Sequence, residues 1–321
     1  GCAPQDDSAA SNKLNIVTTI FPAYDWVREI LGDETDRAEI TTLLDSGVDL
    51  HSYQPTVDDI VKISDCDLFL YVGGESDGWG DDALKNAPNK EQKVIRLLDV
   101  LGDSAKAEET VAGMQAEEHD HEEEEHGHEE EEHDHEEEAE YDEHIWLSLK
   151  NAQVLVAAIS EALQESDPAR KDTYAANAAA YAEKLSALDG EYRAAVDSGK
   201  YKTLLFGDRF PFRYLADDYG LDYYAAFPGC SAETEASFET VSFLAGKMDA
   251  LGLPCVLTIE GTQHKIAETV VQNTAQKNQQ ILTMDSMQAV TANDASSGVS
   301  YLSIMEKNLS VLKKALGQEA E

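Results

Sequence analysis

The stretch from Asp167 to Gly199, DPARKDTYAANAAAYAEKLSALDGEYRAAVDSG, predicts one uninterrupted helix. Asp167 can cap its amino end, Pro168 suits the first turn, and Gly199 ends it. Apolar side chains recur at intervals of three, four and seven residues, at Tyr174, Tyr181, Leu185, Leu188, Tyr192 and Val196. Such a helix is about 45 Å long at about 1.5 Å per residue. We expect it to be a stiff strut between two lobes, the alternative being a helix that lies along a single core.

Strand and helix patterns alternate on both sides of this helix. Before it, strands are expected at 13–19, 38–44, 67–72 and 93–97, with helices ending at Gly32, at 57–63 and at 144–163. After it, strands at 203–206, 221–226, 255–259 and 280–284 alternate with helices at 214–219, 239–251, 266–274 and 301–316. The pattern predicts an α/β fold with two lobes, each a parallel-rich sheet flanked by helices. The lobes are expected at 13–165 and 200–321, joined by the linking helix at 166–199.

Residues 117–138 form a tract that cannot build a core, because it contains nothing apolar. Its 22 residues are thirteen Glu, two Asp, six His and one Gly. Imidazole nitrogens and carboxylate oxygens are ligands for borderline metals such as zinc. We therefore expect a disordered loop that meets a divalent metal, the alternative being a solvated acidic loop without a ligand.

The charge of the chain limits its partners. The 321 residues carry a net charge of −40, of which the tract supplies fifteen negative charges. Nucleic acid is excluded as a partner because phosphate binding needs a basic surface. Adsorption to anionic lipid is disfavoured for the same reason, whereas a strongly acidic protein suits a cationic ligand. We expect a monomer.

The amino terminus reads Gly-Cys-Ala-Pro-Gln and continues as a polar stretch to Asn12. A start of this kind is what remains when a bacterial lipoprotein signal is removed, so residues 1–12 are expected to be a tether with a lipid on Cys2. The alternative is that Gly1 is a cloning remnant and Cys2 an ordinary thiol. The first interpretation predicts an extracytoplasmic protein that is held at the bacterial cell membrane only through that lipid.

The other three cysteines differ in their surroundings. Cys66 lies in a strand-like run and is expected to be a buried free thiol. Cys230 and Cys255 flank one helical segment, and an exported protein could join them in a disulfide. The sequence alone leaves that pairing open.

Two histidines outside the tract stand at loop-to-helix junctions. His51 lies in DLHSYQPT at 49–56, and His144 lies in DEHIWL at 142–147, directly after the tract. Loops at the carboxyl ends of parallel strands are where open α/β sheets bind ligands. Either histidine alone could be structural, but the two together beside a metal-attracting tract favour ligation.

Three carboxylates follow strands of the second lobe. Asp208 follows the strand at 203–206, Glu260 the strand at 255–259, and Asp285 the strand at 280–284. Each could instead cap a helix or form an ion pair, and His264 is a competing ligand. If the three carboxylates face the two histidines across the cleft, the five side chains predict a closed site of four or five ligands. Its nitrogen and oxygen donors suit zinc or manganese. Buried carboxylates also need a cation.

Three motifs carry a family resemblance. The stretch HSYQPT at 51–56 is similar to the family motif His-x-Tyr-Glu-Pro-Thr, and HIWLSLKN at 144–151 is similar to His-x-Trp-Leu-x-Pro. The third motif, at 301–309, reads Tyr-Leu-x-x-Met-x-x-Asn-Leu. The chain resembles the metal-binding lipoproteins of ABC importers for zinc and manganese, a cluster that includes zinc-uptake and adhesin-type proteins, over residues 13–317. The resemblance implies two α/β lobes, a long linking helix and a metal at their interface. The acidic, His-rich loop is typical of the zinc branch.

The resemblance also implies a ligand set. His51 and His144 match the first two ligands of the family, and Asp285 matches its fourth. At the third position, where the family has His or Glu, this chain has Arg209, and a guanidinium cannot ligate. Asp208 or Glu260 is then the expected substitute. Glu143 and Leu149 stand where the family often has proline, which is expected to alter only the shape of the loop.

The favoured function is therefore capture of extracytoplasmic zinc and its delivery to an ABC permease, with the tract as a low-affinity collector or a sensor of zinc level. A manganese-binding importer component or a surface adhesin is the alternative. A metallohydrolase is a weaker hypothesis, because the chain has no His-Glu-x-x-His motif. No catalytic residue is expected.

Overall fold

The structure is a computed structural model that describes residues 13–85, 87–115, 140–261 and 263–318. The expected lipid tether at 1–12 and the tract at 117–138 lie outside the described residues. Among the described residues, every helix is too short or too polar to cross a membrane.

The first sheet holds four parallel strands in the order β2-β1-β3-β4. They are β1 (Leu14–Thr18), β2 (Ala38–Thr42), β3 (Leu68–Tyr71) and β4 (Lys93–Arg96). The accompanying helices are α1 (Phe21–Leu31), α2 (Val57–Asp65), α3 (Trp79–Leu84), α4 (Leu97–Leu101) and α5 (Leu149–Ser166). All residues of β3 are buried, as expected for a strand covered on both faces.

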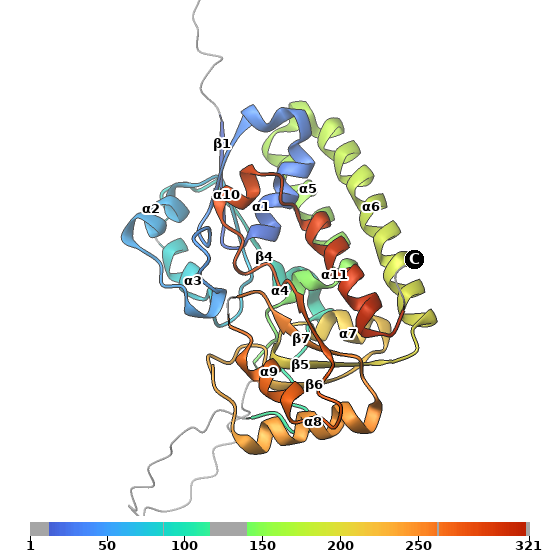
Figure 1. Cartoon of the computed structure of the whole chain (residues 1–321). Helices are drawn as coiled ribbons and strands as arrows, with labels where there is room; N and C mark the ends of the chain where they lie inside the picture. The colour runs from blue at the N-terminus through green and yellow to red at the C-terminus, as the bar shows by residue number, and fades with distance from the viewer. Residues whose placement is uncertain (1–12, 86, 116–139, 262, 319–321) are drawn as a thin grey trace, which may run out of the picture.

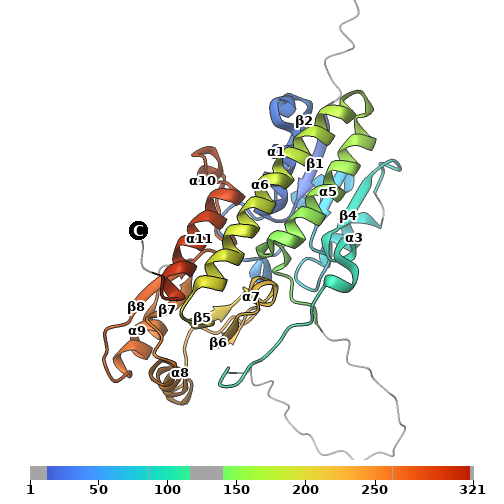
Figure 2. The same ribbon diagram turned by 90° about the vertical axis from the view of Figure 1, so that its right-hand side faces the viewer.

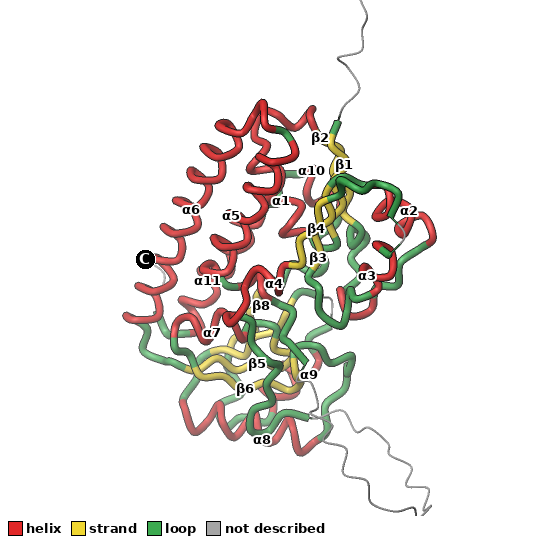
Figure 3. Tube along the Cα trace, turned by 180° about the vertical axis from the view of Figure 1, so that it is seen from behind, coloured by secondary structure: helices red, strands yellow, loops and turns green. Residues whose placement is uncertain are grey.

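The second sheet repeats this topology, with four parallel strands in the order β6-β5-β7-β8. Its strands are β5 (Thr203–Phe210), β6 (Asp222–Pro228), β7 (Cys255–Ile259) and β8 (Gln280–Met284). The helices of this part are α7 (Arg213–Tyr219), α8 (Phe238–Leu251), α9 (Lys265–Gln272), α10 (Ala292–Ser296) and α11 (Tyr301–Ala315). Figure 3 shows the two sheets in yellow, one above the other, with helices on their flanks.

The long helix α6 (Lys171–Ser198) runs past both sheets (Figures 1 and 2). Near its amino end, Asn177 Nδ2 donates a hydrogen bond of 2.9 Å to Ile30 O in α1. Near its carboxyl end, the hydroxyl of Tyr192 donates one of 2.6 Å to Met305 O in α11. The predicted fold of two α/β lobes joined by one long helix is therefore confirmed.

The main apolar core is continuous through both lobes. One cluster of buried side chains extends from Phe69 in the first sheet, through Trp26 and Leu185 in α1 and α6, to Phe206 in the second sheet. A smaller cluster lies on the other side of the second sheet, where α8 and α9 cover it. Because packed interiors resist deformation, this shared core holds the two lobes in a defined relation to each other.

Several predicted boundaries differ from the structure. The helix expected to begin at 144 starts at Leu149, where the Ser148 hydroxyl accepts a hydrogen bond of 3.1 Å from Asn151 N as its cap. The short helices α3, α4 and α10 were not predicted, since each spans six residues or fewer and shows too little periodicity to be recognised.

Cys66, Cys230 and Cys255 are free thiols, and Cys66 is buried as expected. The possible disulfide between Cys230 and Cys255 is not formed. The thiol of Cys230 contacts the Glu108 carboxylate, whereas Cys255 Sγ lies 3.9 Å from the carbonyl of Lys314. The two sulfurs have different neighbours, and the spacing of the two cysteines along the sequence does not show this.

Candidate metal centre

His51 and His144 are positioned by the same local device. His51 lies in a 3₁₀ turn (Leu50–Ser52), and its backbone N–H donates a hydrogen bond of 2.7 Å to Asp49 Oδ1. His144 precedes another 3₁₀ turn (Ile145–Leu147), and its N–H donates one of 3.0 Å to Asp142 Oδ1. In each case the carboxylate of an aspartate two residues earlier accepts a hydrogen bond from the histidine N–H and fixes where the imidazole begins.

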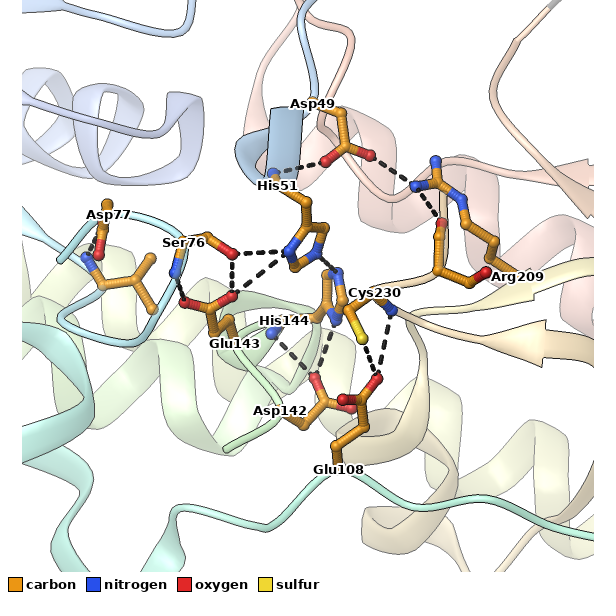
Figure 4. Close-up of polar contacts among 12 residues, drawn as sticks. Asp49, His51, Ser76, Asp77, Glu108, Asp142, Glu143, His144, Arg209 and Cys230 are labelled. Carbon is orange, nitrogen blue, oxygen red and sulfur yellow. Dashed lines mark hydrogen bonds and ion pairs between the residues drawn. The ribbon is translucent and has the colours of Figure 1, made fainter. Parts of the chain in front are cut away.

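The two imidazoles converge, with His51 Nε2 lying 3.1 Å from His144 Nε2 (Figure 4). Their ring centroids are 5.1 Å apart and the rings are inclined at 62°. Two nitrogens bound to one tetrahedral zinc ion at 2.0–2.1 Å lie about 3.3 Å from each other. The structure thus brings together the first two predicted ligands at nearly the separation that a shared metal requires.

The other nitrogen of each ring is held by an oxygen. His51 Nδ1 is 2.7 Å from Ser76 Oγ and 3.4 Å from Glu143 Oε2. His144 Nδ1 is 2.9 Å from Asp142 Oδ1. Partners of this kind keep the proton on Nδ1 and direct the Nε2 lone pair toward a metal. Both Nε2 atoms are therefore oriented for ligation.

The pair binds protons unequally. Burial, and then the charge of His144, lower the pKa of His51 to about 4. Burial also acts to lower the pKa of His144, but the charge and hydrogen bond of Asp142 outweigh it, so that its pKa is raised. A divalent metal competes with protons for these two Nε2 atoms, because metal ligation requires deprotonated nitrogen.

Glu143 is a residue whose role the sequence did not reveal. Its Oε1 accepts a hydrogen bond of 2.8 Å from Ser76 N, and its Oε2 accepts one of 2.5 Å from Ser76 Oγ. The expectation that Glu143 affects only loop shape is wrong, since its carboxylate supports both Ser76 and His51. The position of Glu143 next to His144 in the sequence was the one signal that it could belong to the site. Nothing in the sequence indicates that its carboxylate contacts Ser76.

Asp208 lies inside β5, so the prediction that it follows the end of that strand is wrong. The pairing of β5 with β6 shifts register between Phe206 and Arg209. A Cβ on Gly207 would lie 2.7 Å from Ala267 Cα, so only glycine allows this close approach to α9. Asp208 accepts hydrogen bonds from the N–H groups of Arg209 (2.8 Å) and Ile259 (3.1 Å) and thereby ties β5 to β7.

Glu260 and Asp285 follow adjacent strands, β7 and β8, and lie together as predicted. Glu260 Oε2 accepts a hydrogen bond of 2.7 Å from Ser286 N. Burial, and then the charge of Asp285, raise the pKa of Glu260 to about 8. The Ser286 carbonyl accepts a hydrogen bond of 2.9 Å from Trp146 Nε1, which connects this acid pair to the turn that follows His144.

The three carboxylates are not in contact with the histidine pair among the described residues, and no group of three or more His, Cys, Asp or Glu closes round a common point there. The assignment of Asp208, Glu260 and Asp285 as ligands therefore stays a prediction. His264 stands at the amino end of α9, and its Nδ1 is buried without a hydrogen-bond partner in the described part of the chain.

Arg209 stands at the position where the family resemblance led us to expect a third ligand. Its Nη1 lies 2.8 Å from Asp49 Oδ2 and donates a hydrogen bond of 3.3 Å to the carbonyl of Ser231 (Figure 4). A side chain from β5 thus reaches the loop that carries His51. As a cation it cannot ligate a metal, and its contacts with Asp49 and Ser231 hold the two lobes together there.

A pocket of about 360 Å³ opens beside the histidine pair. Its walls are mostly acidic and aromatic, and include Tyr53, Glu75, Ser76, Trp79, Glu108, Glu140, Tyr141, Asp142, Glu143 and Cys230. Asp208, Glu260 and Asp285 are not among the described residues that line it. Clustered negative charge in a concave site concentrates cations. Glu140 and Glu108, on either side of the tract in sequence, lie at this pocket.

Two α/β lobes on a shared helical core, with paired imidazoles between them, define a two-lobed binding protein. The chain belongs to the family of the periplasmic component A of the zinc-uptake complex, whose model matches residues 16–315. This is a family of uptake components and not of enzymes.

Relatives agree over most of the chain. It is 32% identical over 317 residues to the zinc-binding lipoprotein AdcA of Streptococcus pneumoniae, which covers 99% of this chain and 58% of that protein. It is 29% identical to the high-affinity zinc uptake system protein ZnuA of Bacillus subtilis, covering 95% of this chain and 88% of that one. The Zn(II)-bound ZnuA-like domain of S. pneumoniae AdcA superimposes with a TM-score of 0.72 and 28% identity, covering 95% of this chain and all of that domain. The chain thus spans little more than half the length of the AdcA lipoproteins.

Proposed function

We propose that this protein captures zinc outside the cytoplasm and delivers it to an ABC-type permease. The observation that carries the proposal is the convergence of His51 Nε2 and His144 Nε2 at 3.1 Å, with both Nδ1 atoms held by oxygen. Two neutral imidazoles directed at one point are a zinc-binding unit. The acidic walls of the pocket, and the zinc-binding names of the relatives, support zinc as the cargo. Binding alone suffices, so no catalytic turnover is needed.

The oxygen ligands proposed are Glu260 and Asp285. Two half-buried acids side by side are costly unless a cation or a proton lies with them, and the raised pKa of Glu260 reflects that cost. Asp208 is the less suitable candidate, because it lies within β5 and its carboxylate ties that strand to β7 through Ile259 N. Ligation by the acid pair requires the second lobe to move toward His51 and His144 when the metal binds.

The remaining proposals concern the setting of the protein. A lipid on Cys2 holds a monomer at the outer face of the membrane, with residues 1–12 as its tether. The first lobe comprises 13–165 and the second 200–321, with 166–199 as the connection. The tract at 117–138 gathers zinc weakly and raises its local concentration. Manganese as cargo and a role in surface adhesion are the alternatives, and manganese is favoured only if oxygen donors dominate the site.

Calorimetric titration with zinc tests the proposal. The wild-type protein should show one tight site per chain together with weaker sites. His51→Ala and His144→Ala should each reduce the zinc affinity of the tight site by more than about 100-fold. This loss exceeds the one caused by removing a residue that only hydrogen-bonds to a metal ligand. His264→Ala removes an imidazole that does not contact the pair and should retain the tight site. Full affinity in the double variant His51→Ala, His144→Ala would rule out this centre.

A further inference from the structure

Cys230 lines the same pocket as His51 and His144, although it follows a strand of the other lobe. The turn that carries it is pressed against the pair. A Cβ on Gly229 would lie 2.7 Å from the carbonyl oxygen of Phe210 and 3.2 Å from His144 Cε1, the ring carbon beside Nε2. Glycine at 229 therefore allows the turn to pack directly on the edge of the imidazole from which a metal bond would extend.

Arg209 holds this turn in place. Its Nη1 bonds both to the Asp49 carboxylate, two residues before His51, and to the carbonyl of Ser231, the residue after Cys230. One guanidinium thus fastens the His51 loop and the Cys230 turn to each other. Arg209, which stands where a third ligand is expected, thus clamps the turn after β6 that carries Cys230.

We propose that Cys230 Sγ is the third zinc ligand, and that it completes a nitrogen–sulfur centre with His51 Nε2 and His144 Nε2. The inference rests on the proposed function, which it deepens by specifying the metal class. A soft thiolate favours zinc over manganese, whereas a site of imidazole and carboxylate donors separates the two less strongly. With two imidazoles and the thiolate in place, a four-coordinate zinc ion has one position left, so either Glu260 or Asp285 completes the centre and not both.

Binding exchanges one contact for another. In the structure the Cys230 thiol donates its hydrogen to Glu108, a carboxylate of the same pocket (Figure 4). When zinc arrives, the S–H bond breaks, its proton passes to Glu108 and then to solvent, and the sulfur lone pair forms the bond to zinc. No oxidant or further reactant is required. Glu108 is a positioning residue in this scheme, because it holds the thiol at the pocket until the metal replaces it.

X-ray absorption at the zinc edge distinguishes sulfur from nitrogen and oxygen. Zinc–sulfur bonds measure about 2.3 Å and zinc–nitrogen bonds about 2.0–2.1 Å. The full chain should be loaded with less than one equivalent of zinc so that the tight site fills first. The tract contains no cysteine and cannot supply sulfur. Wild type should show one sulfur neighbour, Cys230→Ser none, and the controls Cys255→Ser and Cys2→Ser should both retain it.

Affinity supplies a second readout. Loss of a residue that only orients a metal ligand lowers metal affinity by about 10- to 100-fold, and Cys230→Ser should weaken zinc binding by at least that factor. In a competition experiment, the variant should also show a smaller preference for zinc over manganese than the wild type. Tight binding of zinc by wild type with only nitrogen and oxygen neighbours would overturn the Cys230 assignment and leave the proposed function intact. Absence of tight zinc binding would instead overturn the proposed function.

Discussion

Arg209 Nη1 lies 2.8 Å from Asp49 Oδ2, so a cation from the second lobe is bonded to the carboxylate that caps the His51 turn. Their side chains are only 23% and 19% exposed, which limits screening by solvent and salt. The pairing lowers the pKa of Asp49 against the opposing effect of its burial, because the charges of Arg209 and His51 favour the carboxylate. The ion pair therefore joins the second lobe to the His51 loop on one side of the cleft.

The ion pair predicts a coupling between the lobes. Arg209→Met and Asp49→Asn should each destabilise the metal-free protein, and the double variant should show a coupling energy of about 1–2 kcal/mol. The reason is that either change leaves the partner charge without its counterpart. Urea unfolding of the four proteins measures this energy. Strictly additive losses would mean that the pair contributes nothing beyond its separate members.

Glu143 should matter for zinc binding although it bonds to no metal itself. Glu143→Gln weakens the support of Ser76 and His51 and should lower zinc affinity by about tenfold to 100-fold, as for other residues that orient a ligand. Calorimetry measures the change. Glu75→Gln is the matched control, because it removes the same charge from the same pocket without a side-chain bond to His51. Equal losses in the two variants would point to general electrostatics instead.

The acid pair predicts how stability depends on pH. Burial and Asp285 raise the pKa of Glu260 from 4.5 to about 8. Within this range the folded protein holds a proton that the unfolded chain releases, so the Glu260 contribution to the free energy of unfolding falls as pH rises. Chemical denaturation of the metal-free protein from pH 5 to 8, in roughly one-unit steps, should show this slope, and Glu260→Gln should flatten it.

Glu268→Gln, a substitution on the surface of α9, is the control for that experiment and should keep the wild-type slope. Zinc should stabilise the wild type most at the upper end of the range, because a bound cation removes the cost of the ionised pair. Equal slopes in wild type and Glu260→Gln would show that Glu260 titrates normally in the folded protein.

The tract at 117–138 predicts weak sites that are separate from the cleft. An unperturbed imidazole has a pKa near ~6.5, so weak sites built from the six histidines of the tract should be lost as pH falls below that value. Deletion of 117–138 should leave one tight site per chain and remove the weaker ones in a calorimetric titration. Loss of the tight site on deletion would contradict this division of roles.

Much of the fold could be predicted from periodicity. The eight strands of the two sheets were all expected, and so was the long helix, because buried parallel strands and helical spacing leave strong local patterns. The register shift in β5 was not, since it depends on the contact of Gly207 with Ala267 in α9. Contacts between distant segments carry no periodic signal.

The same limit applies to the site. His51 and His144 could be found because each stands in a recognisable motif at a loop-to-helix junction. Ser76 and the role of Glu143 could not, because they meet only through a contact between residues 67 positions apart. Arg209 was recognised as a departure from a family pattern, but its bond to Asp49 across 160 positions became visible only in the folded chain.

Zinc-edge anomalous diffraction from a crystal of the zinc-loaded protein tests the central claim most directly. We expect a single strong peak in the cleft, about 2.0–2.1 Å from both His51 Nε2 and His144 Nε2. A principal peak away from these two nitrogens, with their 3.1 Å contact unchanged, would contradict the account.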